Sequence, residues 1–416
     1  MKKIPIAAVS SLALLAVWLY PAKEAKAIPA WARKYNADCS MCHTMNPRLN
    51  AMGHKFRRLG YKLPDEFDSA ETKINAEELA KFTNYFGARG RPRIVYGKTP
   101  GATTNFDLQM HDVTLFYTGS VARNAGFFFE LPFEPSAGNA FLEVGQILLN
   151  FGESDKFFFM RLGQMHQFSG VGFGGLDRGI ALSRPSAVST RINGFRLQHD
   201  GAAVEMGGSI NNFTGLVQVS NGITAAGGSV LNDNDPNKAK DVGVLLEYML
   251  PEHDGSVSAL YINGRAPVPQ NNAATNITGA GNAQYNRFYL FADYFFDTIG
   301  LKPLIGGSYG VDNQFINGIG TATAALITAA NSASWSAFAE LDQKVTGDLY
   351  LVGRFDYIEP TDMAEAASGT RRTWTGTSAF VWQFLDYFRT TLEYQATDNA
   401  ARNLGHSVTG ELQIVF

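Results

Sequence analysis

Two cysteines and a histidine form the chemical motif that stands out in this 416-residue sequence. The chain has only two cysteines, and they stand as Cys39-Ser40-Met41-Cys42, followed directly by His43. In an exported protein such a pair could form a disulfide or a redox-active dithiol. A histidine directly after the second cysteine is instead the spacing of haem attachment, in which two thioethers fix the porphyrin edge and the imidazole binds the iron. The motif therefore predicts one covalently bound haem c, held by Cys39, Cys42 and the proximal ligand His43.

The ligand on the opposite face of the haem has several candidates in the next residues. Met45 follows His43 too closely for the chain to turn around the porphyrin rim. Met52 and His54 lie beyond Pro47, where the backbone can change direction. We expect Met52 to be the distal ligand, with His54 as the alternative and an open or water-bound iron as a third arrangement. The choice matters because methionine ligation raises the haem potential relative to ligation by two histidines.

The first 27 residues have the pattern of an export signal. Lys2 and Lys3 precede an apolar run from Ile4 to Leu19, and Ala25-Lys26-Ala27 fits a small-residue cleavage site. We expect removal of residues 1–27, although a retained anchor is the alternative. No later segment approaches the roughly eighteen consecutive apolar residues of a membrane-spanning helix, so a membrane location of the mature chain would require strands.

The rest of the composition favours an all-β chain. The sequence holds 42 glycines, 30 phenylalanines and 16 tyrosines, without sustained helical heptads. From Leu349 to Tyr357 the odd positions are apolar or glycine, whereas Arg354 and Asp356 share the other face. Sixteen strands of this kind are expected, at residues 82–97, 105–118, 125–134, 141–151, 157–166, 191–209, 212–221, 241–250, 256–265, 284–296, 301–312, 333–345, 349–359, 371–384, 387–397 and 406–416.

Loop lengths distinguish a membrane barrel from a soluble sandwich, because both would alternate. The connections between these strands are alternately long and short, as in outer-membrane barrels with external loops and periplasmic turns. Phe416 also ends an alternating last strand, as the final residue of such barrels does. We therefore predict a 16-stranded antiparallel outer-membrane β-barrel over residues 76–416, with both termini in the periplasm. Residues 28–75 would form the monohaem cytochrome module and its linker.

Charge and size suggest how the two parts join. Removal of the leader lowers the net charge from −3 to −6, and residues 28–63 carry +6, which leaves −12 for the remainder. A module of about 40 residues is too small to shelter a haem and its own core unaided. A barrel of sixteen strands has a lumen that its own side chains do not fill. We therefore expect the basic module to dock inside the acidic barrel, against polar inward-facing residues.

The haem segment resembles the N-terminal motif of the fused outer-membrane cytochrome–porins, the iron(II) oxidases of iron-oxidising bacteria. The resemblance covers about 35 residues: Ile28-Pro29-Ala30-Trp31-Ala32-Arg33-Lys34-Tyr35, the haem box, Pro47-Arg48-Leu49-Asn50, Gly53, Phe56 and Gly60-Tyr61. It implies an iron(II):cytochrome c oxidoreductase in the outer membrane. Extracellular Fe(II) would be the electron donor and a periplasmic soluble cytochrome the acceptor. The sequence departs from that pattern at His54, among other positions, where arginine is usual.

Other functions remain open at the level of the sequence. The same build would serve as an electron conduit for another donor or for outward transfer, or as a solute porin with a regulatory haem module. Hydrolases and nicotinamide enzymes are disfavoured, because no Ser-His-Asp triad, phosphate loop or nucleotide fingerprint is visible. No iron-binding motif stands out either. The acidic loop residues with suitable oxygen ligands are Asp177, Asp233, Asp235, Glu359 and Asp362, and we expect them mainly to keep the loops soluble.

Overall fold

The structure is a computed structural model of the chain. It describes residues 29–69, 81–98, 104–134, 139–140, 142–166, 179–189, 197, 200–221, 240–267, 282–313, 332–359, 372–385, 387–399 and 403–415. The predicted leader, most of the linker after residue 69 and Phe416 lie outside these ranges. Within them, no helix is both long and apolar enough to cross a membrane.

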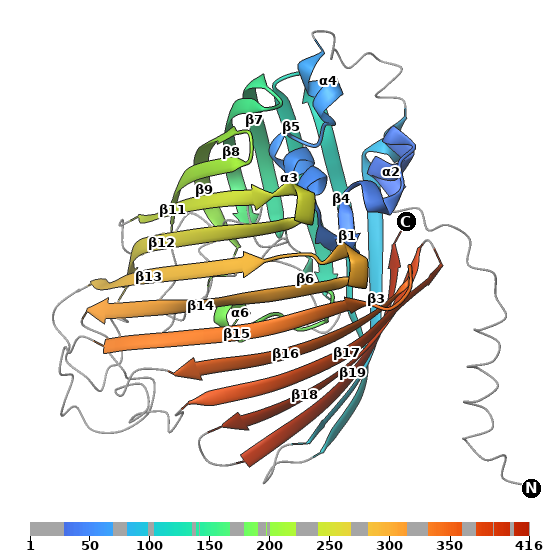
Figure 1. Cartoon of the computed structure of the whole chain (residues 1–416), viewed down its shortest axis with the longest axis vertical. Helices are drawn as coiled ribbons and strands as arrows, with labels where there is room; N and C mark the ends of the chain where they lie inside the picture. The colour runs from blue at the N-terminus through green and yellow to red at the C-terminus, as the bar shows by residue number, and fades with distance from the viewer. Residues whose placement is uncertain are drawn as a thin grey trace, which may run out of the picture.

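Sixteen long antiparallel strands form a closed barrel (Figure 1). Each pairs with its neighbours in the chain, and the last strand pairs with the first through contacts such as His406 with Lys98. The strands are β3 (Phe86–Lys98), β4 (Asn105–Ala122), β5 (Ala125–Glu134), β7 (Val144–Glu153), β8 (Lys156–His166), β9 (Asp200–Ile210), β10 (Phe213–Ser220), β11 (Asp241–Leu250), β12 (Gly255–Pro267), β13 (Asn282–Asp293), β14 (Leu301–Asn313), β15 (Ser332–Lys344), β16 (Leu349–Glu359), β17 (Thr373–Leu385), β18 (Phe388–Asn399) and β19 (Asn403–Val415). A two-residue piece, β6 (Asn139–Ala140), adds to the edge of β5.

The predicted all-β fold and strand count are confirmed. The strands over 125–134, 241–250 and 349–359 agree with the prediction at both ends. The predicted start of the first strand was wrong, because Phe82–Asn84 form a 3-10 turn and β3 begins at Phe86. For the sixth predicted strand, β9 begins at Asp200, and residues 191–196 and 198–199 lie outside the described residues. Leu197, which precedes it, is buried in an apolar cluster that includes Phe157 and Leu216.

The two faces of the barrel differ in chemistry. On β11, Val242, Leu246 and Tyr248 are 40–50% exposed, whereas Asp241 and Glu247 are buried. The outward apolar face suits hydrocarbon, and the inward charged face needs partners inside the barrel. The predicted alternation of β16 is confirmed in the same way, because Leu351 and Phe355 face outward.

The inner wall is not uniformly polar. A cluster of buried side chains from β8 and from β10 to β15 lines one region of the interior. Its members from the strands are Phe157, Phe159, Leu216, Leu245, Leu260, Ile262, Tyr285, Tyr289, Phe291, Leu304 and Phe338. Leu59 and Phe67 from the start of the chain pack into the same cluster. The expectation of a polar lumen was therefore incomplete, because the wall offers both charged and apolar surfaces to what lies within.

The N-terminal segment (residues 29–69) fills one end of the lumen, where α3 and β1 lie inside the curve of the strands in Figure 1. It comprises α2 (Pro29–Tyr35), the 3-10 turn η1 (Cys39–Met41), β1 (His43–Met45), β2 (Arg48–Leu49), α3 (Ala51–Arg58) and α4 (Pro64–Asp68). Its contacts reach the tight connections at 154–155 and 251–254, through Ser154 with Asp68 and Asp254 with Thr44. We call this side of the barrel, where the short connections lie, the short-turn end.

Candidate haem site

The haem box occupies the start of the N-terminal segment's folded core. Cys39 opens the turn η1, and the amide of Cys42 donates to the carbonyl oxygen of Cys39 at 3.1 Å, which closes one tight turn. Both cysteines are half-buried, and no disulfide joins them. His43 follows as the first residue of β1 and pairs with Leu49 of β2. The two thiols and the imidazole thus leave one short turn in succession, as attachment to a single porphyrin edge requires.

His43 is held in the orientation that an iron ligand needs. Its Nδ1 lies 3.0 Å from the carbonyl oxygen of Pro47. With Nδ1–H donated to that carbonyl, the tautomer and the ring plane are fixed and Nε2 is the nitrogen left for a metal. Burial lowers the pKa of His43 to about 4. The ring is therefore neutral near pH 7, which is the form that coordinates iron.

The state of Cys42 argues against a redox-active dithiol. Burial raises the pKa of the Cys42 thiol to about 11. Reactive cysteines in disulfide exchange have lowered pKa values, because the thiolate is the nucleophile. The two thiols and the imidazole are the residues that covalent attachment of a haem requires.

Asn50 and Gly53 lock helix α3 onto the haem box. Asn50 caps the helix, since its Oδ1 accepts a hydrogen bond from the amide of Gly53 at 2.9 Å. Its Nδ2 donates to the carbonyl oxygens of Ser40 and Met41, and its own amide donates to Cys42. A side chain at position 53 would overlap the Cys42 carbonyl oxygen and crowd Leu49. The close packing of α3 on the haem box therefore explains why Asn50 and Gly53 follow Pro47 at this spacing.

The distal candidates fall on different faces of α3. Met52 is half-buried, and His54 is buried with an Nδ1 that has no hydrogen-bond partner among the residues that the structure describes. Side chains two residues apart on a helix point about 200° apart, so Met52 and His54 cannot both face the same side of the haem. Burial, and then the charge of Arg58, hold the pKa of His54 well below its usual range, so it too is neutral. Met45 is buried against barrel residues including Tyr350 and Val352, as a packing residue.

Buried ion pairs fasten the N-terminal segment to the barrel wall. Arg48 lies between two carboxylates of β15, with its Nε 2.9 Å from Asp342 and its Nη2 bonded to Glu340. Arg58 pairs with Glu247 of β11 and donates to the hydroxyl of Thr214 at 3.0 Å. Removing one partner of such a pair costs about 3–5 kcal/mol, because the other charge is left buried and alone. These contacts fix the segment's position in the lumen.

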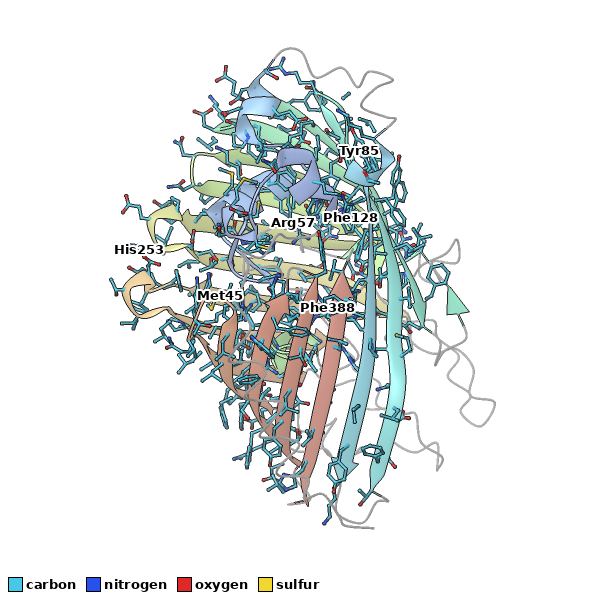
Figure 2. The ribbon with its side chains drawn as sticks, turned by 90° about the vertical axis from the view of Figure 1, so that its right-hand side faces the viewer. Met45, Arg57, Tyr85, Phe128, His253 and Phe388 are labelled. Atoms are coloured by element: carbon cyan, nitrogen blue, oxygen red, sulfur yellow. The ribbon has the colours of Figure 1, made fainter. Side chains whose placement is uncertain are left out.

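A second set of contacts lies beside the haem box. Asp254 accepts hydrogen bonds from Thr44 and, at 3.4 Å, from the amide of Ala51. Asn46 donates to Gln383 of β17 at 3.1 Å, and its carbonyl oxygen accepts from Arg389 of β18 at 3.5 Å. In Figure 2 the labelled Met45 lies near the level of Phe388, the first residue of β18. The haem box therefore faces the short-turn end of the lumen.

A part of the connection between β8 and β9 folds into the barrel on the other side of the box. We call it the inner loop (residues 179–189), and it contains the short helix α6 (Ser186–Ser189). Ile180 and Ala181 pack in the same cluster as Met45. The amides of Ser183 and Ser186 donate to Glu393 at 2.9 Å and to Asp356 at 2.7 Å. Nothing in the sequence indicates this inward fold beyond the length of the connection.

The acidic loop residues do not gather into an iron site in the part of the chain that the structure describes. Asp177, Asp233, Asp235 and Asp362 lie outside it, and Glu359 accepts a hydrogen bond from Tyr357 at 2.9 Å. Within the described ranges, no group of three or more histidine, cysteine or acidic side chains is arranged to hold a metal ion.

Comparison with known proteins concerns the barrel. No protein-family model and no curated protein matches the chain. Among solved structures it is similar to the outer membrane channel DcaP of Acinetobacter baumannii, with 11% identity, a TM-score of 0.55 and coverage of 80% of this chain and 97% of that chain. It is also similar to OprB of Pseudomonas putida, with 9% identity, a TM-score of 0.56 and coverage of 82% of this chain and 96% of that chain. An anion-selective porin from Comamonas acidovorans has 12% identity to this chain and a TM-score of 0.52, with coverage of 80% of this chain and 98% of that chain.

The barrel has the porin fold. At these identities the likeness concerns the fold, and it supports an outer-membrane location together with the apolar outward face. The porin-type barrel agrees with the barrel half of the predicted cytochrome–porin, and the solute channels among these structures match the alternative reading more directly. The haem, its ligands and the electron-transfer partners remain predictions that rest on residues 39–54.

Proposed function

We propose that this protein is an outer-membrane electron-transfer cytochrome, in which one haem c held by Cys39, Cys42 and His43 sits inside a porin-type barrel. The observation that carries the proposal is the docked haem box. His43 is oriented by the Pro47 carbonyl, and the segment that bears it is fastened to the wall by Arg48 and Arg58. A bound haem would supply a one-electron carrier, and the chain's residues would orient it and keep it from bulk water.

The resemblance of residues 28–61 supplies the donor and the direction. Extracellular Fe(II) would give its electron to the haem, which would pass it to a soluble cytochrome in the periplasm. The short-turn end would face the periplasm, with both chain termini on that side, as in barrels with short periplasmic turns. Oxidation at the outer side would leave insoluble ferric product outside the cell, and the acidic barrel would attract the cation.

Haem reduction by ferrous iron tests this function. The full-length protein, purified in detergent with its haem and oxidised, is mixed with Fe(II) near neutral pH while haem absorbance is followed. We expect reduction by Fe(II) as well as by dithionite. Reduction by dithionite alone would overturn the iron donor and leave the cytochrome, and absence of covalent haem would overturn both.

A solute porin with a regulatory haem segment is the second candidate, and the likeness to solute channels favours it. The two functions differ in conductance, because the N-terminal segment and the inner loop occupy the lumen at and beyond the haem box. In planar bilayers, a conductance like that of an open porin for the haem-loaded protein would support the porin. Low conductance, together with reduction of the haem by Fe(II), would support the cytochrome.

A further inference from the structure

Among the described residues, two arginines on the inner wall have buried nitrogen atoms without hydrogen-bond partners, and one of them, Arg389, contacts Asn46 near the haem box. Arg389 of β18 is buried, its Nε has no hydrogen-bond partner, and its Nη1 reaches the carbonyl oxygen of Asn46 at 3.5 Å. Arg89 of β3 is also buried, and both its Nε and its Nη1 lack partners. A buried guanidinium with unused N–H groups is costly unless an acceptor satisfies it.

The two arginines belong to one patch of wall. Arg389 is opposite Gln413 of β19, and Val415, two residues on, is opposite Arg89. Across two strand spacings and two residues along β19 their backbones are about 12 Å apart, within reach of two side chains of this length. The charged and titratable groups of the patch are Arg89, Arg91, Arg93, Arg389, Asp112, Glu130, Glu411, Tyr350 and His111.

The carboxylates of this patch are taken by the other arginines. Asp112 accepts from Arg91 at 2.5 and 2.6 Å and from Arg89 at 3.0 Å. Glu411 accepts from Arg93 at 2.5 Å. Four guanidinium groups thus face three carboxylates, and Arg389 makes no ion pair in the described part of the chain. The patch has one positive charge more than it neutralises, and the surplus lies at Arg389.

We propose that Arg389, with Arg89 next to it along the wall, binds a propionate carboxylate of the haem. The inference rests on the proposed covalent haem. Guanidinium and carboxylate match as paired donors and acceptors, and a charge-assisted bond is the usual partner of a buried arginine. Asn46, which contacts Arg389, lies three residues after His43. Tyr350 interacts electrostatically with both Arg389 and Cys39, so the patch borders the haem box on the wall side.

The test uses the full-length, haem-loaded protein in detergent and the variants Arg389→Gln and Arg389→Lys. Covalent haem is first measured by mass and by the pyridine haemochrome. Redox titrations then follow between pH 5 and 8. In Arg389→Gln we expect the ratio of reduced to oxidised haem at a fixed applied potential to fall about tenfold, since one unpaired buried charge acts over the haem radius at an effective dielectric of about 20.

The pH profile separates a propionate partner from loss of charge alone. Without its arginine, the propionate should titrate in the measured range, so the potential of Arg389→Gln should become pH-dependent while Arg389→Lys stays close to the wild type. Arg161→Gln, which removes a buried arginine of β8 that pairs with Glu205 of β9, is the control and should not change the pH profile.

Two results would overturn the propionate site. One is covalent haem in Arg389→Gln with an unchanged pH profile. The other is a wild-type potential that shifts when chloride is replaced by phosphate at constant ionic strength, which would indicate a free anion at Arg389. Failure of the wild type to attach haem would instead overturn the proposed function. If Arg389→Gln does not fold, Arg389→Met, which keeps a side chain of similar length without the charge, takes its place: a pH-dependent potential supports the site, and an unchanged pH profile contradicts it.

Discussion

At the scale of single residues, the haem box depends on a glycine that no side chain can replace without a shift. The overlap of an added Cβ at position 53 is with a backbone carbonyl, that of Cys42, which does not move as a flexible side chain would. We expect Gly53→Ala to weaken the packing of α3 on the box by about 1–3 kcal/mol, the usual cost of overpacking. The measurement is denaturant unfolding followed by haem absorbance, together with haem content per chain.

Gly353→Ala is the matched control for this change. Gly353 lies on β16, and an added Cβ there meets no atom within 4 Å. Haem content and stability should match the wild type. Equal behaviour of Gly53→Ala and Gly353→Ala would contradict the close packing of α3 on the haem box.

The distal ligand is a second question at this scale. If Met52 is the ligand, as the sequence predicts, Met52→Leu should abolish the sulfur-to-iron charge-transfer band and lower the haem potential, because a soft thioether favours the ferrous state. If His54 is the ligand, the wild type should lack that band and His54→Gln should change the haem spectrum. A wild-type spectrum that neither variant changes would indicate an open or water-bound iron.

At the scale of elements, the strands were predictable because alternation and loop length carry the information. The outer face of the strands is apolar, and where the inner face is polar or small, a period of two marks the strand within the sequence. The connections between Glu153 and Lys156 and between Lys344 and Leu349 are short, so the sequence shows where one strand ends and the next begins. The haem motif stands out in the sequence for a different reason, since attachment chemistry requires both residue types and spacing, and the haem itself stays a prediction.

The elements that the sequence did not predict depend on distant partners. The inner loop bends inward because its amides meet Asp356 and Glu393, which lie more than 150 residues away. Arg48 and Arg58 were read as part of a net charge, but each pairs with particular carboxylates on β15 and β11. No local pattern distinguishes an arginine with a buried partner from one in water.

The outward face of β13 offers a test of the membrane orientation. Phe288 lies near the middle of that strand and is 49% exposed. We expect Phe288→Lys to destabilise the barrel in lipid bilayers by about 2–4 kcal/mol, because a charge near the bilayer midplane is expensive. Reversible denaturant unfolding in vesicles measures it, and Phe288→Leu should have little effect. A neutral outcome for the lysine would mean that this face does not meet hydrocarbon.

At the scale of the whole molecule, a basic segment is held in an acidic barrel by a few buried ion pairs. Reversing a charge in one of these pairs should therefore displace the segment from the lumen. In Arg48→Glu, a carboxylate replaces the guanidinium between Glu340 and Asp342, so attraction becomes repulsion in a buried position. We expect the N-terminal segment to lose its place and the conductance of single barrels in planar bilayers to rise.

Lys55→Glu provides the comparison for this charge reversal. Lys55 lies on α3 of the same segment but is only half-buried and outside the ion pairs with Glu340, Asp342 and Glu247. Both variants change the net charge equally, so a general effect of charge would open both barrels alike. A rise in conductance for Arg48→Glu alone would show that the carboxylates of β15 hold the segment in the lumen, because water does not screen the repulsion at that buried site. If neither barrel opens, ion pairs are not what keeps the segment in the lumen, and the apolar contacts of Leu59 and Phe67 must hold it instead.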